Sequence, residues 1–398
     1  MPITDKLASC CGANVLAKWT ARGEGRELIS KIMSEKKVRW GFLSTAWIGM
    51  KNWQSVALSG NGVIVAVASR ERAKAQAWID ECSAHVPFAE KPEAVEGYDA
   101  LLARDDIDAV YIPLPTGVRT EWAIKAAQAG KHVVCEKPCG VDVAEVEEIL
   151  AACDEAGVQF MDGVMFMHSA RLDALRKTLT DGSIGELRRI SSAFSFNGGE
   201  DFREGNIRMH SDLEPLGCLG DLGWYNIRFN LWVMDYAMPK AVSGRMLRGA
   251  ARSDSPDKVP MEFSGELFFD NDVTASFYCS FLTANQQWAH VCGTEGTLLL
   301  DDFVVPFYGS EACFTVSNTE SNQHVCDFNM ERHDRVVSVR EYGGSHPTAQ
   351  ETGLFRNFGE IVLNGTPDKT WGDVVLKTQQ VTMACIESSK QDGARVEL

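Results

Sequence analysis

The chain of 398 residues lacks any long apolar run, and no stretch approaches the roughly 20 residues that a membrane-spanning helix needs. It also lacks a basic excess, since its formal net charge is -16 and no basic stripe stands out. These absences disfavour a membrane-spanning protein and a nucleic-acid-binding protein. With 45% apolar and 24% charged residues, the composition is that of an ordinary globular protein of two or three domains.

Cysteine pairs of the C-x-x-C type are also missing, although the chain has twelve cysteines. Zinc ribbons and thioredoxin-like redox sites are therefore disfavoured. No group of His, Cys and carboxylate residues has metal-ligand spacing, so we expect no metal site. No secretory h-region opens the chain, which indicates a cytoplasmic location with reduced thiols, most of them buried as small apolar residues.

The first 37 residues differ in charge from the rest, because they carry seven Lys/Arg and four Asp/Glu. The stretch RELISKIMSEKK within them predicts a short amphipathic helix. We interpret residues 1–37 as an N-terminal extension packed on the body. An organelle-targeting segment is the alternative, and the acidic residues argue against it.

From residue 38 onward, short apolar runs alternate with helical patterns. Strands are expected at 38–43, 63–69, 109–115, 132–138 and 158–163, with helices between them that include 71–82, 119–130 and 143–157. A series of βα units predicts an α/β fold with a doubly wound parallel sheet, the Rossmann arrangement. We expect this cofactor-binding domain to span residues 38–163.

After about residue 165 the pattern changes to successive strands with turns between them. They are expected at 187–196, 265–270, 274–282 and 296–302, preceded by a helix at 170–182 and followed by one at 373–391. This order predicts an α+β domain over residues 164–398, with a large, mostly antiparallel open sheet.

The first strand runs into the turn Gly41–Gly49, where a dinucleotide fingerprint would read G-x-G-x-x-G. This chain offers Ser44, Ala46 and Gly49 instead, so the signal comes mainly from the position of the turn between a first strand and a helix. The cofactor contacts predicted in the turn are Ser44, Thr45, Ala46, Trp47 and Ile48.

The second strand ends at Ser69 and Arg70, where NAD-preferring sites place an acid for the ribose 2′-hydroxyl. A hydroxyl and a guanidinium, with Lys74 one helical turn on, suit a 2′-phosphate instead. The sequence therefore predicts NADP(H) over NAD(H). A solvated Arg70 at a helix start is the alternative.

The stretch Glu136-Lys137-Pro138 ends a strand at the carboxyl edge of the sheet, where doubly wound folds bind ligands. A lysine beside a nicotinamide can hold a substrate oxygen, Pro138 restricts the backbone, and Glu136 can meet a cofactor ribose or orient the lysine. Taken alone, the tripeptide is more typical of a surface ion pair. The neighbouring strand end adds four predicted cofactor contacts, Pro113, Leu114, Pro115 and Thr116.

The turn, "ASR" at 68–70, "YIPLPT" at 111–116, "EKP" and "GCLGDLGWYNIRF" at 217–229 follow one another at suitable spacing. In this order they resemble the glucose–fructose oxidoreductase/inositol dehydrogenase (Gfo/Idh/MocA) family, closest to its dihydrodiol/D-xylose dehydrogenase branch. The resemblance covers residues 38–398. It implies an NADP-dependent dehydrogenase or reductase acting on a CH–OH group of a sugar, polyol or cyclic trans-diol. It also implies a homodimer or larger homo-oligomer that forms through the open face of the second sheet.

Single residues can be matched to the family's motifs. The E-K-P motif maps to Glu136, Lys137 and Pro138, and the peptide before that proline is often cis in the family. The second catalytic motif of the branch, an aspartate followed four residues later by a tyrosine, maps to Asp221 and Tyr225. The family's P-N-x-x-H loop reads PTGVR at 115–119 here, so its contacts are left open.

The chemistry of these residue types supports the same roles. Asp221 and Tyr225 share one face if they lie on a helix. A phenol with a pKa of about 10 is a poor base near neutrality, and a neighbouring ammonium lowers that pKa. We therefore predict Tyr225, Lys137 and Asp221 as the catalytic residues, with Tyr225 as general acid/base. A core tyrosine with a satisfied hydroxyl is the alternative.

The polar segment 196–217 lies between a strand and that helix and can cover the site. Arg203, Asn206 and Arg208 are its candidate substrate contacts, with simple solvent exposure as the alternative. His168, near the domain junction, is a candidate contact of cofactor and substrate, or a structural histidine.

Two other functions remain open from the sequence. One is a glycosidase that keeps its cofactor and cleaves glycosidic bonds through transient oxidation, which would hydrolyse without net NADP(H) consumption. The other is a cofactor-bound regulatory protein without turnover, against which the intact Lys137 and Tyr225 argue.

Overall fold

The structure, a computed structural model, describes residues 36–398, and Val38–Leu398 form one compact unit. The helix predicted in the N-terminal extension lies outside the described residues. Within them, no helix combines the length and apolarity that crossing a bilayer requires. All ten cysteines in this part are free, and seven of them are buried.

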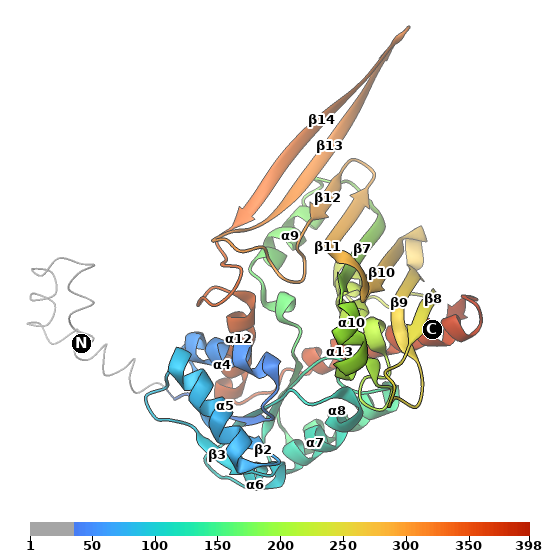
Figure 1. Cartoon of the computed structure of the whole chain (residues 1–398). Helices are drawn as coiled ribbons and strands as arrows, with labels where there is room; N and C mark the ends of the chain where they lie inside the picture. Colours follow the sequence, from blue (N-terminus) through green and yellow to red (C-terminus); the bar gives the residue numbers. More distant parts are fainter. Residues whose placement is uncertain (1–35) are drawn as a thin grey trace, which may run out of the picture. The chain divides into compact units, whose positions relative to one another are not determined.

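A six-stranded parallel sheet opens the unit (Figure 1). Its strands are β1 (Val38–Leu43), β2 (Gly62–Ser69), β3 (Glu93–Glu96), β4 (Ala109–Ile112), β5 (His132–Cys135) and β6 (Phe160–Asp162). They lie in the order β3-β2-β1-β4-β5-β6, so the strand order reverses between β1 and β4. Ligands bind at such a switch point, outside the carboxyl ends of the strands. The short, polar β3 has no apolar run and was not predicted.

Helices cover both faces of this sheet. They are α4 (Trp47–Ser59), α5 (Arg72–His85), α6 (Tyr98–Leu102), α7 (Thr116–Gln128) and α8 (Val143–Ala156). Residues of α4 and α5 share one buried cluster with Trp40 and Phe42 of β1, and residues of α6, α7 and α8 belong to the other. Trp40 and Phe42 lie in one apolar layer and Leu43 in the other, which explains why β1 is apolar on both faces apart from Arg39 near its start.

The second sheet has nine strands in the order β14-β13-β12-β11-β7-β10-β9-β8-β15. They are β7 (Leu187–Asn197), β8 (Ala241–Ala250), β9 (Val259–Phe268), β10 (Thr274–Ser280), β11 (Leu282–Gly293), β12 (Thr297–Leu300), β13 (Ala312–His324), β14 (Asp327–Val339) and β15 (Val396–Glu397). All neighbours are antiparallel except β7 and β10. The predicted fold class is confirmed, although β8, β11, β13, β14 and β15 were not predicted.

Helices of the second half are α9 (Arg171–Thr180), α10 (Gly199–Gly205), α11 (Trp224–Val233), α12 (Gln350–Asn364) and α13 (Thr370–Lys390). α11 and α13 pack on the large sheet, whereas α12 returns to α4 and β1. Phe355 of α12 meets Trp40 edge-on, with ring centroids 5.1 Å apart. The end of the chain thus completes the core of the first sheet, and the boundary expected at residue 163 stays a prediction.

A buried ion pair holds α11 against the first sheet. Arg228 donates to Asp162 at the end of β6 at 2.8 Å, and both side chains are 0% exposed. Arg228 also donates to Thr378 of α13 at 2.8 Å, and the Trp224 indole donates to Asp162 at 3.3 Å. Because a buried charge needs its partner, this pair fixes the place of α11, the helix that carries Tyr225.

Candidate active site

A cavity of about 490 Å³ lies at the carboxyl edge of the parallel sheet, between this edge and α11. The first sheet contributes side chains from the turns after β1, β4 and β5, namely Ala46, Trp47, Ile48, Pro113, Leu114, Glu136 and Lys137. The second half contributes, among others, Phe194, Phe196, Arg208, Asp221, Tyr225 and Val305. Apolar walls with a few converging polar groups are typical of a small-molecule site.

Lys137 is the centre of the polar groups. Its side chain is 9% exposed, and the Lys137–Pro138 peptide is cis. The ammonium donates to the Asp221 carboxylate and to the Asp221 backbone carbonyl, both at 2.7 Å. It also lies 4.9 Å from the ring centroid of Tyr225. The strand end that was singled out in the sequence therefore meets the later Asp-Tyr motif directly.

Asp221 stands between two cations. Arg208 donates from Nε to Oδ2 at 2.7 Å, while Lys137 holds Oδ1. Burial by itself raises the pKa of Asp221, but the guanidinium of Arg208 and the ammonium of Lys137 outweigh it and hold this pKa well below its usual range. The carboxylate is ionised at any physiological pH and positions both cations.

Tyr225 is the second residue of α11, which directly follows a five-residue π-helical turn, Leu219–Gly223. Asp221 lies inside that wider turn, so the two residues do not share a regular helix face as expected from their spacing. π-Turns are frequent at functional sites. A Cβ on Gly220 would lie 3.2 Å from Pro138 Cγ, so glycine lets this turn press against the E-K-P segment.

The pKa of Tyr225 differs from the sequence-based expectation. Burial raises it well above its ordinary value, and the charges of Glu136, Asp221 and Asp162 add to the effect, while Arg208 opposes it. The ammonium of Lys137 donates to Asp221 and lies over the ring of Tyr225. A phenol in this setting is a proton donor at neutral pH.

Glu136 lines the cavity with its carboxylate held from behind. The buried hydroxyl of Tyr111 donates to its Oε1 at 2.7 Å. A Cβ on Gly163 would lie 2.9 Å from the same oxygen, so the glycine after β6 makes room for this carboxylate. One oxygen is thus anchored, and the residue is positioned for a ligand hydroxyl.

The turn after β1 has an unusual backbone. Ser44, at the place of the first fingerprint glycine, has a φ of 144°, a conformation that glycine adopts far more readily. Its hydroxyl accepts from the Ala46 amide at 3.0 Å, which compensates in part. A Cβ on Gly49 would lie 3.1 Å from the Trp78 ring, so the third glycine is kept for close packing against α5.

We expect Ser44→Gly to leave the free energy of unfolding within about 1 kcal/mol of the parent, because relief of backbone strain offsets the lost hydrogen bond. Ser44→Val should lower it by about 1–3 kcal/mol, since a β-branched residue resists this φ. Urea unfolding of both variants checks this. Equal stability of the two variants would contradict the strained turn.

A model of the Gfo/Idh/MocA oxidoreductase family, with its NAD-binding Rossmann fold, matches residues 38–164, and the model of the family's C-terminal domain matches residues 172–299. The chain belongs to this family. The family predicted from the sequence is thereby confirmed.

The relatives include members of the predicted branch. D-xylose 1-dehydrogenase (NADP(+)) 2 of Haloferax volcanii is 33% identical, with 65% of this chain and 74% of that protein covered. Trans-1,2-dihydrobenzene-1,2-diol dehydrogenase of Mus musculus is 28% identical, with 68% and 76% covered. A 3-ketoreductase from Actinomadura kijaniata, solved in complex with NADP and TDP-benzene, superimposes with a TM-score of 0.72 at 25% identity, covering 89% of this chain and 98% of that one.

This Gfo/Idh/MocA chain departs from the family in the loop PTGVR, and the structure explains the change. Thr116 donates from its amide and hydroxyl to Glu214 at 3.1 and 2.6 Å. A Cβ on Gly117 would come within 1.9 Å of the Asp212 carbonyl, so only glycine fits there. Buried Arg119 donates to the carbonyls of Leu114 and Pro138 and joins the loops after β4 and β5. The amide and the hydroxyl of Thr116 are therefore already hydrogen-bonded to Glu214.

Ten of the predicted ligand contacts do not line the cavity, namely Ser44, Thr45, Ser69, Arg70, Lys74, Pro115, Thr116, His168, Arg203 and Asn206. Arg203 is exposed on α10, and the side chain of Asn206 accepts from the Arg208 amide at 3.0 Å, which caps a short 3-10 turn (Ile207–Met209). This cap directs Arg208 inward, so of the three candidates in segment 196–217 only Arg208 lines the site. The segment is itself partly helical rather than an open loop.

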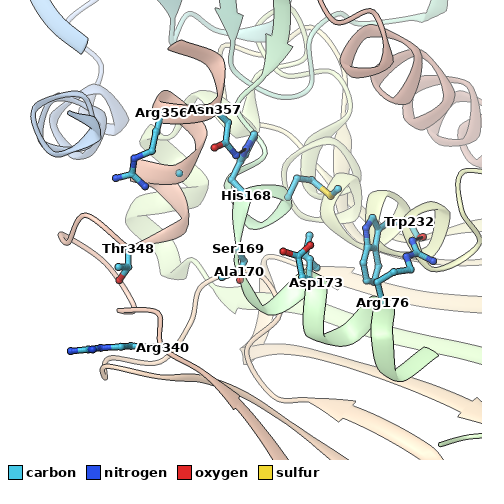
Figure 2. Close-up of a pocket in the computed structure, with 13 residues that line it drawn as sticks. His168, Ser169, Ala170, Asp173, Arg176, Trp232, Arg340, Thr348, Arg356 and Asn357 are labelled. Carbon is cyan, nitrogen blue, oxygen red and sulfur yellow. Dashed lines mark hydrogen bonds between the residues drawn. The ribbon is translucent and has the colours of Figure 1, made fainter. Parts of the chain in front are cut away.

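His168 lies elsewhere. It lines a second cavity of about 540 Å³ between α9 and α12, where Asn357 approaches its Nδ1 at 3.0 Å (Figure 2). Its ring stacks on Trp371 at 4.7 Å, and burial lowers its pKa to about 3. The structure supports the alternative interpretation of a structural, neutral histidine and corrects its placement beside the nicotinamide.

Sequence reasoning missed several lining residues. Phe194 and Phe196 alternate along β7 and so point to one side, a period-2 signal that was available. Glu214 lay inside the polar segment already singled out. Val304 and Val305 come from the irregular stretch after β12, for which the sequence holds no comparable signal.

Proposed function

We propose that this protein is an NADP(H)-dependent oxidoreductase that transfers a hydride between nicotinamide and a carbon bearing a hydroxyl or keto group, in a sugar, a polyol or a cyclic trans-diol. The observation that carries the proposal is the meeting of Lys137, Asp221 and Tyr225 at one cavity, at the switch point of a Rossmann sheet.

Each polar residue has a part in this reaction. In reduction, Tyr225 donates its phenolic proton to the substrate oxygen and is left as a phenolate, which regains a proton from solvent; in oxidation, the phenolate form takes the proton of the substrate hydroxyl. Lys137 stabilises negative charge that develops on that oxygen, since its ammonium is fixed in a nearly dry site. Asp221 positions Lys137 and Arg208. The bound dinucleotide supplies or accepts the hydride.

NADP(H) is the cofactor. The xylose dehydrogenase relative is named for NADP(+), and the ketoreductase relative was solved with NADP. In this chain Arg70 follows β2 and Lys74 lies in the first turn of α5; both are exposed, and neither side chain forms an ion pair or hydrogen bond within residues 36–398. Two unpaired cations at this strand end suit a 2′-phosphate.

Replacing Arg70 with alanine should weaken NADPH binding by about tenfold, because one charge-assisted contact to a phosphate is worth about 1.5–3 kcal/mol before solvent screening. NADH affinity should not change. The matched control is Arg72→Ala, which removes an exposed arginine that pairs with Glu93 at 3.8 Å. Fluorescence titration with both dinucleotides measures the ratio, and an equal loss for NADH would contradict the assignment.

The walls of the cavity support a ring-shaped substrate. Phe194 and Phe196 offer apolar surface opposite the polar floor of Glu136, Lys137 and Asp221. A pyranose or a cyclic diol has such an apolar face and a hydroxyl-bearing edge. The names of the relatives, which include a xylose, a deoxysugar and a dihydrodiol enzyme, support the same class.

The deciding experiment is reduction of NADP+ and NAD+ by the purified protein, across aldoses, polyols and trans-dihydrodiols. Turnover with NADP+ on one of them supports the proposal. Glycoside hydrolysis without net NADP(H) consumption would identify the glycosidase alternative instead. Tight NADPH binding without either reaction would favour the regulatory alternative.

The cytoplasmic location and the assembly through the second sheet stay predictions. A homodimer or larger homo-oligomer is the expected state, and light scattering on the purified chain tests it. A monomer across the micromolar range would contradict this expectation.

A further inference from the structure

The hairpin β13–β14 leaves the body of the molecule as a two-stranded arm (Figure 1). The short β12 pairs with β13 only up to Ser317, so residues 318–334 have no third strand beside them in the described part of the chain. An isolated two-stranded hairpin is at best marginally stable in water. Its outer strand, β14, presents an unpaired edge 13 residues long.

Large apolar side chains gather on this arm without a packing partner. Phe328, Met330 and Val336 are 74%, 70% and 64% exposed. They are alternate residues of one strand, so they share one face. Val325, in the turn at the tip, is 87% exposed. An apolar face of this kind on an otherwise polar arm marks an interaction surface.

A second exposed apolar group lies at the base of the arm. Phe307 and Tyr308 are 62% and 98% exposed. The Gly343 amide donates to the Gly309 carbonyl at 3.1 Å, which brings their loop beside the segment that follows β14. The arm thus carries apolar side chains at both of its ends.

The charges on β14 identify the partner. Residues 331–335 read Glu-Arg-His-Asp-Arg, so residues at equal distances on either side of His333 carry opposite charges. If the strand pairs antiparallel with an identical strand about a two-fold axis at His333, Glu331 faces Arg335 of the second copy and Arg332 faces its Asp334. Met330 then faces Val336 of the second copy. Opposite charges and apolar pairs directly across a ladder are both stabilising.

Neighbouring registers lack this match. A shift of the axis onto Arg332 or Asp334 puts two like charges directly opposite each other at the axis. An axis between Arg332 and His333 sets Glu331 against Asp334, and one between His333 and Asp334 sets Arg332 against Arg335. Like charges directly opposite each other destabilise a strand pair. Among these registers, only the one centred on His333 opposes each charge of residues 331–335 with its complement.

We infer that this protein forms a homodimer by pairing β14 edge to edge with β14 of a second copy, about a two-fold axis at His333. In this antiparallel arrangement the tip of each arm, with the exposed Val325, points toward the base of the arm of the second copy, where Phe307 and Tyr308 are exposed.

Two like charges face each other within one hairpin, and the pairing of two arms offsets their repulsion. Glu320 of β13 stands directly across from Glu331 within the same hairpin, both exposed. Like charges at directly opposite positions repel. In the pair of arms, Arg335 of the second copy lies on the other side of Glu331 and compensates for this repulsion.

The first test reverses one charge. Glu331→Arg sets two arginines against each other on both sides of the axis, and we expect the dissociation constant of the full-length dimer to rise by about tenfold or more in analytical ultracentrifugation. The double variant Glu331→Arg/Arg335→Glu should restore it. Glu320→Arg is the matched control: it makes the same change in charge and relieves the same repulsion, but it lies on the inner strand and should leave the dimer intact.

The second test crosslinks the axis. Residues facing each other across an antiparallel pair have Cα atoms about 4.5–5.5 Å apart, within the span of a disulfide. Oxidised His333→Cys should give a covalent dimer whose crosslinked peptide contains residue 333 twice, whereas Asn329→Cys should give none through position 329. A monomeric parent, an unchanged dimer in Glu331→Arg, or no 333–333 crosslink would each overturn the edge pairing. An unchanged dimer would point to the open face of the sheet instead.

Discussion

Tyr225→Phe should lower the turnover number by about 10²- to 10⁴-fold and leave NADPH binding nearly unchanged. The substitution removes only the phenolic oxygen, so the packing of the ring against Phe166 and Phe194 is preserved. The hydroxyl is buried with a raised pKa, and under the proposed function it donates the proton that a reduced substrate oxygen needs. Initial rates with the best substrate, beside a fluorescence titration with NADPH, separate chemistry from binding.

Tyr236→Phe is the matched control for this prediction. Tyr236 is another buried tyrosine, and burial raises its pKa to about 12, but its hydroxyl lies 3.9 Å from Met167 Sδ and away from the catalytic cavity. We expect it to retain full activity. If Tyr225→Phe turned over at the parental rate, the proton would have to come from another group, and the assignment would be wrong.

Lys137→Met should lower the turnover number by about 10²- to 10³-fold, the usual effect of removing one fixed donor from a developing oxyanion. Methionine keeps most of the volume of the side chain. It removes the charge that faces Asp221 at 2.7 Å, so the pKa of that buried carboxyl rises and Arg208 alone holds it. We therefore expect the turnover number of Lys137→Met to fall further as the pH is lowered and Asp221 becomes protonated. The parent should show no such fall, because its Asp221 stays ionised.

Lys131→Met controls for the loss of a buried lysine as such. Lys131 is 7% exposed and donates to the carbonyls of Arg104 and Ile107, with no part in the cavity. Its replacement should lower thermal stability and spare the turnover number of the folded enzyme. Similar turnover losses in both variants would mean that Lys137 acts through the fold rather than on the substrate.

Local patterns accounted for most of the elements. The parallel strands were found because each is a short apolar run bounded by helical periodicity, as in Val38–Leu43 and His132–Cys135. β3 was not predicted, because an edge strand of four residues needs no apolar run. The arm was not predicted for a related reason. Asp327–Val339 is mainly polar, and its strand conformation comes from pairing with β13.

The candidate site divides in the same way. Lys137, Asp221 and Tyr225 were predicted from motifs whose order along the chain is specific. Arg208 was one of three equal candidates, and only the cap formed by Asn206 selects it. His168 was misplaced because the sequence does not say that α12 returns to the first sheet and brings Asn357 against the histidine.

By itself the sequence determined the family, the two sheets, the cofactor class and the residues that meet at Lys137, because these depend on periodicity and on motifs that are local in the chain. The tertiary structure alone decided which charges face each other across long separations. Asp221 lies 84 positions from Lys137, and their contact depresses the pKa of the carboxyl, while burial raises that of Tyr225. Desolvation and Coulomb interactions act through space, so no pattern along the chain reports them.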